Sequence, residues 1–354
     1  MIPVLFDKTA TSYDSLGIGT LSDTVECGVV EERNNAFGLT AKIPVDGEIA
    51  DSINVGNLII ADASPQQKRQ AFEIYDVKKS IDGLLNVKAN HISYRLCFSI
   101  VRPFTATGIG AVINQINTKS NANYVEGNPF TFTTDMTDTS TAFTLSEFRS
   151  VKNLLGGMDG SIVQKFGGCY KWDNWTVSLL GSRGADNGVR IVYGKNLTGL
   201  TAEYDLGDRP TAVFPIWTSD SQTVTGNIQL SEYVGLYPHH RTVIHDFADQ
   251  FENAPTTAQL NAAGAAWING KGLPSVNLKT SFVPLYQTVE YKDLANVESV
   301  EIDDTVHVYV PTLDVDVKAK VIKTKYNVLA DRYDSVEVGN FRTSITDAIR
   351  SVRG

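Results

Sequence analysis

Apolar and polar residues alternate with a period of two along much of the N-terminal part of the chain. Within the segment from Gln70 to Tyr75, the polar Glu73 lies between the apolar Phe72 and Ile74, as in a strand with one face in water. Strand-like segments in this region are 41–45, 57–62, 70–77 and 84–89. Turn residues such as Asp82-Gly83 separate them. Short strands with turns between them are typical of antiparallel barrels and sandwiches, so we expect residues 1–98 to form a small antiparallel β-barrel.

A helical pattern follows in the middle of the chain. Between Gly108 and Lys119, four apolar residues recur at helical spacing, namely Ile109, Val112, Ile113 and Ile116. The sequence Thr144-Leu145-Ser146-Glu147 fits a capping box and predicts a helix that begins near Leu145. A further short helix is expected over residues 161–166.

Three short apolar runs then predict a β-meander. The runs 169–172 and 175–180 flank Asp173-Asn174, and the run 189–193 follows a Gly-rich turn. β-branched and aromatic residues favour strands, while Asp, Asn and Gly tolerate the positive φ of tight turns. Residues 99–190 are therefore expected to form an α+β middle domain that ends in this meander.

Strand-like alternation returns in the C-terminal part of the chain. Turns are expected at Asp303-Asp304 and near Pro311, and the Ala-rich segment 257–269 predicts one helix before Pro274. The expected divisions are a second antiparallel β-barrel over 191–236 and 275–340, a helix-containing insertion over 237–274, and a mobile C-terminal tail over 341–354. The expected fold class is α+β, mainly β, with two small antiparallel β-barrels and inserted α+β domains.

Composition narrows the function classes. A chain of 354 residues favours two or more domains, and no apolar run is long enough to span a bilayer as a helix. We expect a soluble protein without a secretory signal. The net charge of -9 disfavours tight binding of nucleic acid, which depends on clustered Lys and Arg. The three cysteines, Cys27, Cys97 and Cys169, match no zinc spacing and predict reduced thiols in the core.

The candidate catalytic and metal-binding residues do not form a known motif. His239, His240 and His245 lack the spacing of a zinc site, so we expect loop histidines that are exposed or hydrogen-bonded. His91 precedes Ser93 without a GxSxG elbow, and a structural histidine that closes the first barrel is favoured. The glycine pairs at 156–157 and 167–168 lack a phosphate-binding frame. We therefore expect no catalytic residues, no metal and no cofactor.

Asp314 and Asp316 are the candidate functional residues. In the sequence from Leu313 to Lys318, strict alternation places both aspartates on one face of a strand. This face is either an ordinary solvent face or the lining of a wet, negatively charged passage. Lys318 and Lys320 follow in the same register and make the charge of the face mixed.

A series of short motifs resembles the prophage endopeptidase tail family, the N-terminal hub domain of tail-associated lysins. The motifs are Phe72-Glu73-Ile74-Tyr75-Asp76-Val77, Ala89-Asn90-His91-Ile92-Ser93-Tyr94, Leu154-Leu155-Gly156-Gly157, Phe166-Gly167-Gly168, Val192-Tyr193-Gly194-Lys195-Asn196-Leu197, Asp331-Arg332-Tyr333 and Val338-Gly339-Asn340. They occur in the family's order and extend over most of the chain. The resemblance implies the fold of a phage baseplate hub, in which three copies form a ring and two β-barrels of each copy continue the tail tube.

The resemblance also implies a location and partners. The chain is expected at the distal end of the phage tail, after assembly in the cytoplasm of the bacterial host. Its expected partners are two further copies of itself, the distal tail protein and the tape-measure protein, with DNA only in transit. Any lytic activity is expected in a domain downstream of Gly354. The alternatives are a peptidoglycan hydrolase and a cell-wall carbohydrate-binding module, the second suggested by Trp172 and Trp175.

Overall fold

A computed structural model describes most of the chain. The described residues are 1–121, 129–156, 160–192, 197–205, 209–219, 222–251, 253–269, 271–272, 275–282, 300–310 and 315–339. The chain divides into a main unit of residues 1–201 and 278–354 and a small unit of residues 202–277. The predicted C-terminal tail, 341–354, lies outside the described residues.

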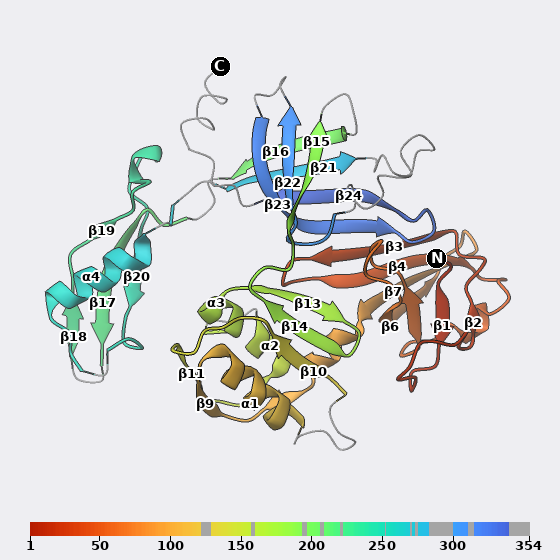
Figure 1. The fold of residues 1–354 in the computed structure, drawn as a ribbon, viewed down its shortest axis with the longest axis horizontal. Coiled ribbons are helices and arrows are strands. Elements are labelled where there is room, and N and C mark those ends of the chain that lie inside the picture. Colours follow the sequence, from red (N-terminus) through yellow and green to blue (C-terminus); the bar gives the residue numbers. More distant parts are fainter. Residues whose placement is uncertain are drawn as a thin grey trace. The chain divides into compact units, whose positions relative to one another are not determined.

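One sheet of thirteen strands forms the centre of the main unit and curls into a half-barrel (Figure 1). Its N-terminal strands are β1 (Val4–Phe6), β2 (Gly19–Thr20), β3 (Glu26–Glu32), β4 (Phe37–Pro44), β5 (Leu58–Ala61), β6 (Gln70–Lys79) and β7 (Leu84–His91). Its C-terminal strands are β15 (Asp186–Val192), β16 (Leu197–Asp205), β21 (Ser275–Phe282), β22 (Thr305–Val310), β23 (Val315–Asn327) and β24 (Arg332–Gly339). The order is β16-β21-β24-β23-β3-β4-β7-β6-β5-β1-β2, and β22 joins β15 to β23.

The long strand β23 belongs to both halves of this sheet. Its first part pairs with β22, and its last part pairs with β3, from Lys323 opposite Glu32 to Asn327 opposite Gly28. In Figure 1, the blue C-terminal strands accordingly continue into the red N-terminal strands. The described strands of the two predicted barrels therefore form one continuous sheet. In addition, β15 and β22 are parallel, although an antiparallel arrangement was predicted.

Side chains along the strands alternate between buried and more exposed positions, and the buried ones form the core beneath the sheet. In β4, the buried side chains are Phe37, Leu39, Ala41 and Ile43. His91 lies in the same core, stacked on Phe37 with ring centroids 4.3 Å apart. Its side chain accepts a hydrogen bond from the Ser93 amide and caps the 3-10 helix η2 (Ile92–Cys97). The predicted structural role of His91 is confirmed, and burial lowers its pKa well below the usual value.

A second 3-10 helix in the N-terminal part of the main unit, η1, is Ala50–Ser52.

In its described residues, 99–121, 129–156 and 160–190, the middle region combines small sheets with three helices. Its helices are α1 (Ile109–Asn121), α2 (Val151–Leu155) and α3 (Ile162–Phe166). Its strands are β8 (Ile100–Val101), β9 (Phe104–Thr107), β10 (Thr131–Thr134), β11 (Ala142–Leu145), β12 (Arg149–Ser150), β13 (Cys169–Asp173) and β14 (Thr176–Leu180). Helix α1 is the predicted amphipathic helix, and its four predicted apolar residues are buried.

The helix predicted near Leu145 is wrong. Residues up to Leu145 form β11, which pairs with β9 so that Phe143 packs against Phe104, with ring centroids 5.9 Å apart. Helix α2 begins later, where the Ser150 hydroxyl accepts a hydrogen bond from the Asn153 amide. Cross-strand packing of buried aromatic rings thus overrides a local capping pattern.

The predicted meander is confirmed for two of its strands only. Strands β13 and β14 form the hairpin, and Asn174 takes a positive φ of 48° in the turn. The predicted third strand, β15, instead joins the main sheet, and β14 pairs in parallel with β10. The intervening segment leads the chain to the main sheet, where Arg183 contacts Glu31 of β3.

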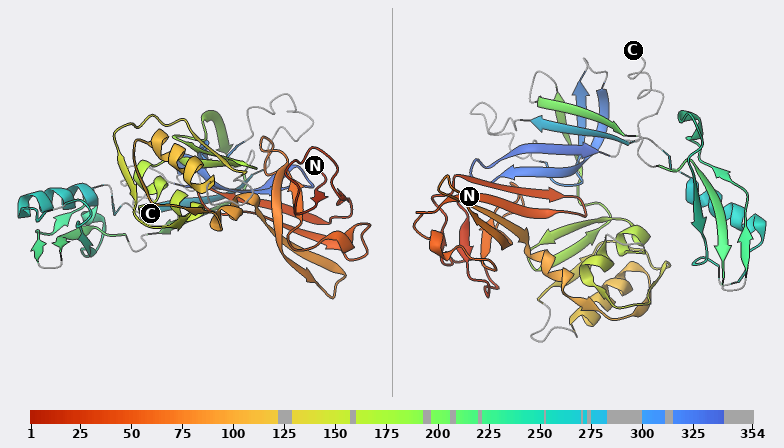
Figure 2. Two further views of the ribbon diagram at one scale, coloured as in Figure 1. Left: turned by 90° about the horizontal axis from the view of Figure 1, so that it is seen from below. Right: turned by 180° about the vertical axis from the view of Figure 1, so that it is seen from behind.

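In its described residues, the small unit is a four-stranded sheet with one α-helix (Figure 2). Its elements are β17 (Ala212–Thr218), β18 (Thr223–Thr225), β19 (Gln229–Leu230), the 3-10 helix η3 (Val234–Leu236), β20 (Thr242–Asp246) and α4 (Thr257–Ile268). Helix α4 is the predicted Ala-rich helix, and Thr256 and Gln259 form a capping box at its start. Leu260 of α4 packs with Trp217 and Phe247 in the core.

The structure places β17, β18 and β19 in this unit, whereas the sequence analysis assigned residues 191–236 to the second barrel. These strands pair with one another and with β20. The alternation in β17 predicts a strand but does not identify its neighbours. One neighbour of β17 in this unit is helix α4. The two elements pack closely, since Gly264 of α4 lies so near Pro215 of β17 that an added Cβ would be 3.0 Å from the proline ring.

Candidate functional site

The side of the main sheet that faces away from the core carries most of its charged residues, and we call it the polar face. Cross-strand register places Glu32 opposite Lys323, Glu26 opposite Lys42, and Thr40 opposite Lys88. Directly opposed residues share one face of a sheet. The members of the polar face used below are Glu26, Glu32, Thr40, Lys42, Asn86, Lys88, Asp186, Lys318, Lys320, Lys323, Lys325, Asn327, Asp334 and Glu337.

An irregularity in β23 keeps its polar side chains on this face along the whole strand. Before it, Lys318 and Lys320 are the polar positions, and after it they are Lys323 and Lys325. The pairing with β24 shifts by one residue between Val321 and Lys323, which is a β-bulge. Without the extra residue, a period of two would turn the later lysines toward the core.

Most lysines of the polar face have a carboxylate neighbour. The measured N–O distances are 3.0 Å for Lys42 and Glu26, 2.7 Å for Lys318 and Asp186, 3.1 Å for Lys320 and Asp303, 2.6 Å for Lys323 and Glu32, and 3.8 Å for Lys325 and Asp334. A lysine that is already paired gains less from a phosphate than a free one does. The face is therefore rich in charge but weakly attractive to nucleic acid.

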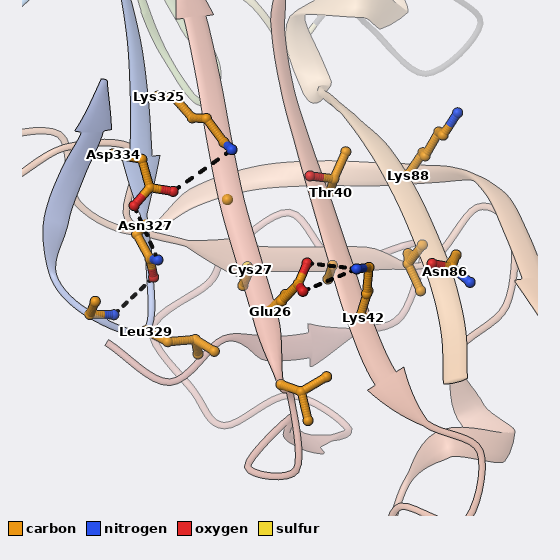
Figure 3. Close-up of a pocket in the computed structure, with 15 residues that line it drawn as sticks. Glu26, Cys27, Thr40, Lys42, Asn86, Lys88, Lys325, Asn327, Leu329 and Asp334 are labelled. Carbon is orange, nitrogen blue, oxygen red and sulfur yellow. Dashed lines mark hydrogen bonds and ion pairs between the residues drawn. The ribbon is translucent and has the colours of Figure 1, made fainter. Parts of the chain in front are cut away.

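A groove of about 660 Å³ crosses the polar face where β3, β4 and β7 meet the ends of β23 and β24 (Figure 3). The Glu26–Lys42 pair lies in its centre, and the Asp334 carboxylate lies between Lys325 and Asn327 at one side. The lining residues include amides, a hydroxyl and charges of both signs, without a histidine or an aromatic ring, and burial raises the pKa of the Cys27 thiol to about 12. Such a lining offers no nucleophile with a base and no stacking platform for a sugar.

The structure locates one of the two candidate aspartates within a strand. Asp314 lies outside the described residues, whereas Asp316 is opposite Tyr309 in the register of β22 and β23. The prediction that Asp314 and Asp316 share one face of this strand stays a prediction.

A second charged group is buried where distant parts of the main unit meet, and we call it the Arg183 cluster. The Arg183 side chain is only 4% exposed and donates hydrogen bonds to both carboxylate oxygens of Glu31. It also donates to Gln67 Oε1 at 2.9 Å and to the Tyr170 carbonyl at 3.3 Å. Glu301 completes the cluster, with its Oε2 atom 3.8 Å from Arg183 Nη2.

The turn at 303–304 places two more carboxylates beside this cluster. Asp303 accepts hydrogen bonds from Arg33 Nε at 2.9 Å and from the Arg183 amide at 3.1 Å. Asp304 accepts from the Ala185 amide at 2.8 Å. Gly184 lies so close to the backbone of this turn that a side chain has no room. The predicted turn at Asp303-Asp304 is confirmed, but its carboxylates are buried and hold the turn against the preceding segment.

The histidine group does not converge on one point. His239 and His240 are exposed, while His245 stacks on Trp267 with ring centroids 4.4 Å apart. Among the residues that the structure describes, no group of three or more His, Cys, Asp or Glu side chains is placed to hold a metal ion. Cys27 and Cys169 are buried free thiols, as predicted, but Cys97 is exposed.

The tryptophans that suggested carbohydrate binding are not free platforms. Trp172 is 2% exposed, and the Lys152 ammonium lies 3.9 Å from the centre of its ring. Trp175 packs on the core cluster of β1 and β5, where its ring stacks with Tyr13 at a centroid distance of 6.5 Å. Both rings therefore stabilise the fold.

Comparison with known proteins identifies the class of fold. Prophage tail protein gp18 from Listeria monocytogenes EGD-e has 12% sequence identity, a TM-score of 0.60 and coverage of 100% of both chains. The 43 kDa tail protein of prophage MuSo2 from Shewanella oneidensis has 11% identity, a TM-score of 0.61 and coverage of 96% of this chain and 98% of its own. A tail protein from Neisseria meningitidis MC58 has 10% identity, a TM-score of 0.58 and coverage of 96% and 97%. The fold is that of phage tail proteins.

The family comparison agrees with the fold comparison. The model of the prophage endopeptidase tail family matches residues 185–349, from β15 to beyond β24. The resemblance to this family that the sequence predicted is confirmed. No curated protein sequence matches the chain. In the part of the chain that the structure describes, no helix combines the length and apolar character needed to cross a membrane.

Sequence reasoning missed the Arg183 cluster. Its members come from β3, from the loop between β5 and β6, from the segment after β14 and from the turn before β22. No spacing along the chain relates these segments. The only local signal was the pair Asp303-Asp304, which indicated a turn and not a buried charge.

Proposed function

We propose that this chain is a structural protein of a phage tail that serves as the baseplate hub. Three copies form a ring that closes or extends the tail tube and lets DNA pass. The observation that carries the proposal is the fold similarity to tail proteins over nearly the whole of each chain. The family match to residues 185–349 supports it independently.

We propose two tube domains for each subunit, as in the predicted barrels, but with the two domains joined in one sheet. In the assembled ring, β1 to β7 supply the first tube domain of each subunit, and β15, β16 and β21 to β24 supply the second. The shared strand β23 fixes the two domains to each other within one sheet. The middle region, 99–190, and the small unit lie outside the tube. The small unit replaces the predicted insertion at 237–274.

The ring requires further contacts within the virion. We propose that it lies at the distal end of the tail, docks on the distal tail protein and contacts the tape-measure protein, after assembly in the host cytoplasm. Isolated chains are expected to be monomers or weak trimers, because neighbouring rings help to hold tail subunits and a net charge of -9 adds repulsion. Light scattering over a range of concentrations measures this, and a stable dimer would contradict the hub proposal.

The polar face near Asp314 and Asp316 is proposed to line the passage for DNA. Paired charges, repeated by the symmetry of a ring, allow phosphate to pass without adhesion. Replacement of both aspartates by Lys should slow or block DNA ejection from assembled virions, while the folding stability changes by no more than about 0.5 kcal/mol. A matched control is Glu147→Lys with Asp249→Lys, which makes the same change of charge at two exposed positions elsewhere. Normal ejection by the Asp314/Asp316 variant would show that these residues do not line the passage.

A peptidoglycan hydrolase is the alternative, suggested by the name of the family. The Arg183 cluster does not supply its chemistry, because the guanidinium is held by Glu31 and Gln67 and no nucleophile lies among the residues that it contacts. A zymogram with purified cell walls tests this alternative. Lysis by residues 1–354, absent in a heat-inactivated sample, would overturn the purely structural role.

A further inference from the structure

Glu301 differs from Asp303 and Asp304, the other carboxyl groups of its turn, in its ion pairs and hydrogen bonds. Asp303 is 2.9 Å from Arg33 and 3.1 Å from Lys320, and Asp304 accepts hydrogen bonds from two backbone amides. Among the described residues, Glu301 forms its ion pair with Arg183, at 3.8 Å. The hydrogen bonds of that guanidinium go to Glu31, Gln67 and Tyr170. Glu301 is therefore close to a positive charge that is already engaged by another carboxylate.

Burial favours the neutral form of Glu301, and charges of both signs lie around it. Glu31 of β3 and Asp304 of the same turn are both negative, and Arg183 is the opposing charge. The Ser64 hydroxyl, from the loop between β5 and β6, donates a hydrogen bond of 2.5 Å to Oε1. Burial raises the pKa of Glu301 to about 7, against the lowering effects of Ser64 and Arg183.

Water can reach this carboxyl group in the folded protein. Glu301 lines a pocket of about 290 Å³ together with Lys171, Asn187 and Asp304. Lys171 of β13 is the further charged group at this pocket. Proton exchange at Glu301 therefore does not require unfolding of the sheet.

The turn that contains Glu301 also begins the parallel pairing of β15 and β22. The Thr305 amide donates to the Ala185 carbonyl at 3.0 Å, and the Ala185 amide donates to Asp304 Oδ1 at 2.8 Å. These bonds connect the segment that carries Arg183 to the turn that carries Glu301. Repulsion inside the cluster acts directly on them.

We propose that Glu301 is a protonation-dependent latch: its neutral carboxyl group lets the 300–304 turn close on the Arg183 cluster, and its ionisation loosens the turn and the start of the β15–β22 pair. With Glu301 neutral, Arg183 has one ionised partner in direct contact, Glu31. With Glu301 ionised, Glu31 and Glu301 share one guanidinium, and the carboxylate of Asp304 adds a further negative charge in the same turn as Glu301. This latch operates whether or not the chain forms a ring.

Amide hydrogen exchange of the full chain tests the latch. An open state in which Glu301 has its ordinary pKa becomes about tenfold more populated, relative to the closed state, between pH 6 and pH 8.5. After correction for intrinsic exchange rates, the Ala185 and Thr305 amides should lose about tenfold in protection over this range. The Leu39 amide, in β4, should not change.

Two variants test whether Glu301 causes the pH dependence of amide protection. Glu301→Gln keeps the shape of the side chain and should make the protection of Ala185 and Thr305 independent of pH. Glu147→Gln removes an exposed carboxylate paired with Arg149 and should leave the pH dependence intact. An unchanged wild-type protection between pH 6 and 8.5, or a full pH dependence in Glu301→Gln, would overturn the proposal. If Glu301→Gln does not fold, the proposal can be tested by NMR titration of the Glu301 side-chain carboxyl carbon in the wild-type protein. A titration midpoint near pH 7 supports the latch, and a midpoint below pH 5 overturns it.

Discussion

The Arg183 cluster and the polar face contain the same kinds of ion pair in different surroundings. Arg183 and Glu31 are 4% and 2% exposed, whereas Lys42 and Glu26 are 42% and 65% exposed. Water screens the second pair, and loss of one partner leaves the other hydrated. In the buried pair, loss of either partner leaves an ion without solvent. Burial, and not the number of pairs, therefore decides which charges hold the main unit together.

The two regions also have different proposed roles: the Arg183 cluster stabilises the subunit, and the polar face lines the passage for DNA. The Arg183 cluster joins four distant segments and determines the path from the hairpin β13–β14 into the main sheet. On the polar face, pairs such as Glu26–Lys42 and Asp186–Lys318 join strands of the main sheet and are exposed to solvent. A tail tube needs both properties: subunits that keep their shape and a passage that does not hold DNA.

The largest effect is expected from Arg183→Met. The substitution leaves Glu31 buried without its partner and should lower the free energy of unfolding by about 3–5 kcal/mol. Urea denaturation at pH 7 measures it. The double variant Arg183→Met with Glu31→Gln should recover part of the loss, because no buried charge remains unpaired. A loss below about 1 kcal/mol would show that the cluster behaves like a surface pair.

An effect of the opposite sign is expected for Lys152→Met. Lys152 is a buried cation without a carboxylate: its ammonium has no hydrogen-bond partner among the described residues and lies over the rings of Trp172 and Tyr94. Burial lowers its pKa to about 8. At pH 7, the charged amine thus opposes folding, and the Met variant should be more stable by roughly 1–2 kcal/mol.

The pH dependence of this effect follows from the direction of the shift. Between about pH 8 and the ordinary pKa of 10.5, the unfolded chain binds more protons at Lys152 than the folded chain does. The stability of the wild type should therefore rise with pH over this interval, and the gain from Lys152→Met should shrink. Urea midpoints at pH 7 and pH 10 measure both. A gain that stays constant, while a matched Lys119→Met variant shows none, would contradict a titrating Lys152.

The sequence predicted the elements that depend on local pattern. Helix α1, helix α4 and the hairpin with its Asp173-Asn174 turn were correct because their apolar spacing and turn residues act within a few positions. The helix predicted near Leu145 was wrong because its capping signal competes with the packing of Phe143 on a strand that is distant in sequence. Local signals are reliable only where no tertiary contact opposes them.

The partners of the strands were harder to predict. Alternation in β15, β17 and β23 indicates strands but contains no information about which edge each one joins. The bulge before Lys323 shifts the alternation within β23 by one residue, so that the lysines before and after it lie on the same face, and the sequence pattern does not reveal it. The candidate sites show the same difference: periodicity predicts a shared face for Asp314 and Asp316, while the Arg183 cluster depends on contacts between residues up to 152 positions apart.

The smallest effect is expected on the polar face, from the pair Glu26 and Lys42. A double-mutant cycle with Glu26→Gln, Lys42→Met and both should give a coupling energy of about 0.5 kcal/mol or less, since both side chains are well exposed. The coupling should decrease further in 1 M salt, where the Debye length is about 3 Å. The pair Lys323 and Glu32, with exposed fractions of 33% and 25%, is the matched comparison and should couple more strongly.

The order of these three couplings is the sharpest test of the comparison. If burial controls the strength of each pair, the coupling energies should increase from Glu26–Lys42 to Glu32–Lys323 and then to Glu31–Arg183. All three can be measured by urea denaturation in one buffer. Equal couplings would mean that the geometry of each pair, and not its exposure, sets its contribution. In that case the polar face would stabilise the main sheet as strongly as the buried cluster, and its charges could not be altered without loss of the fold.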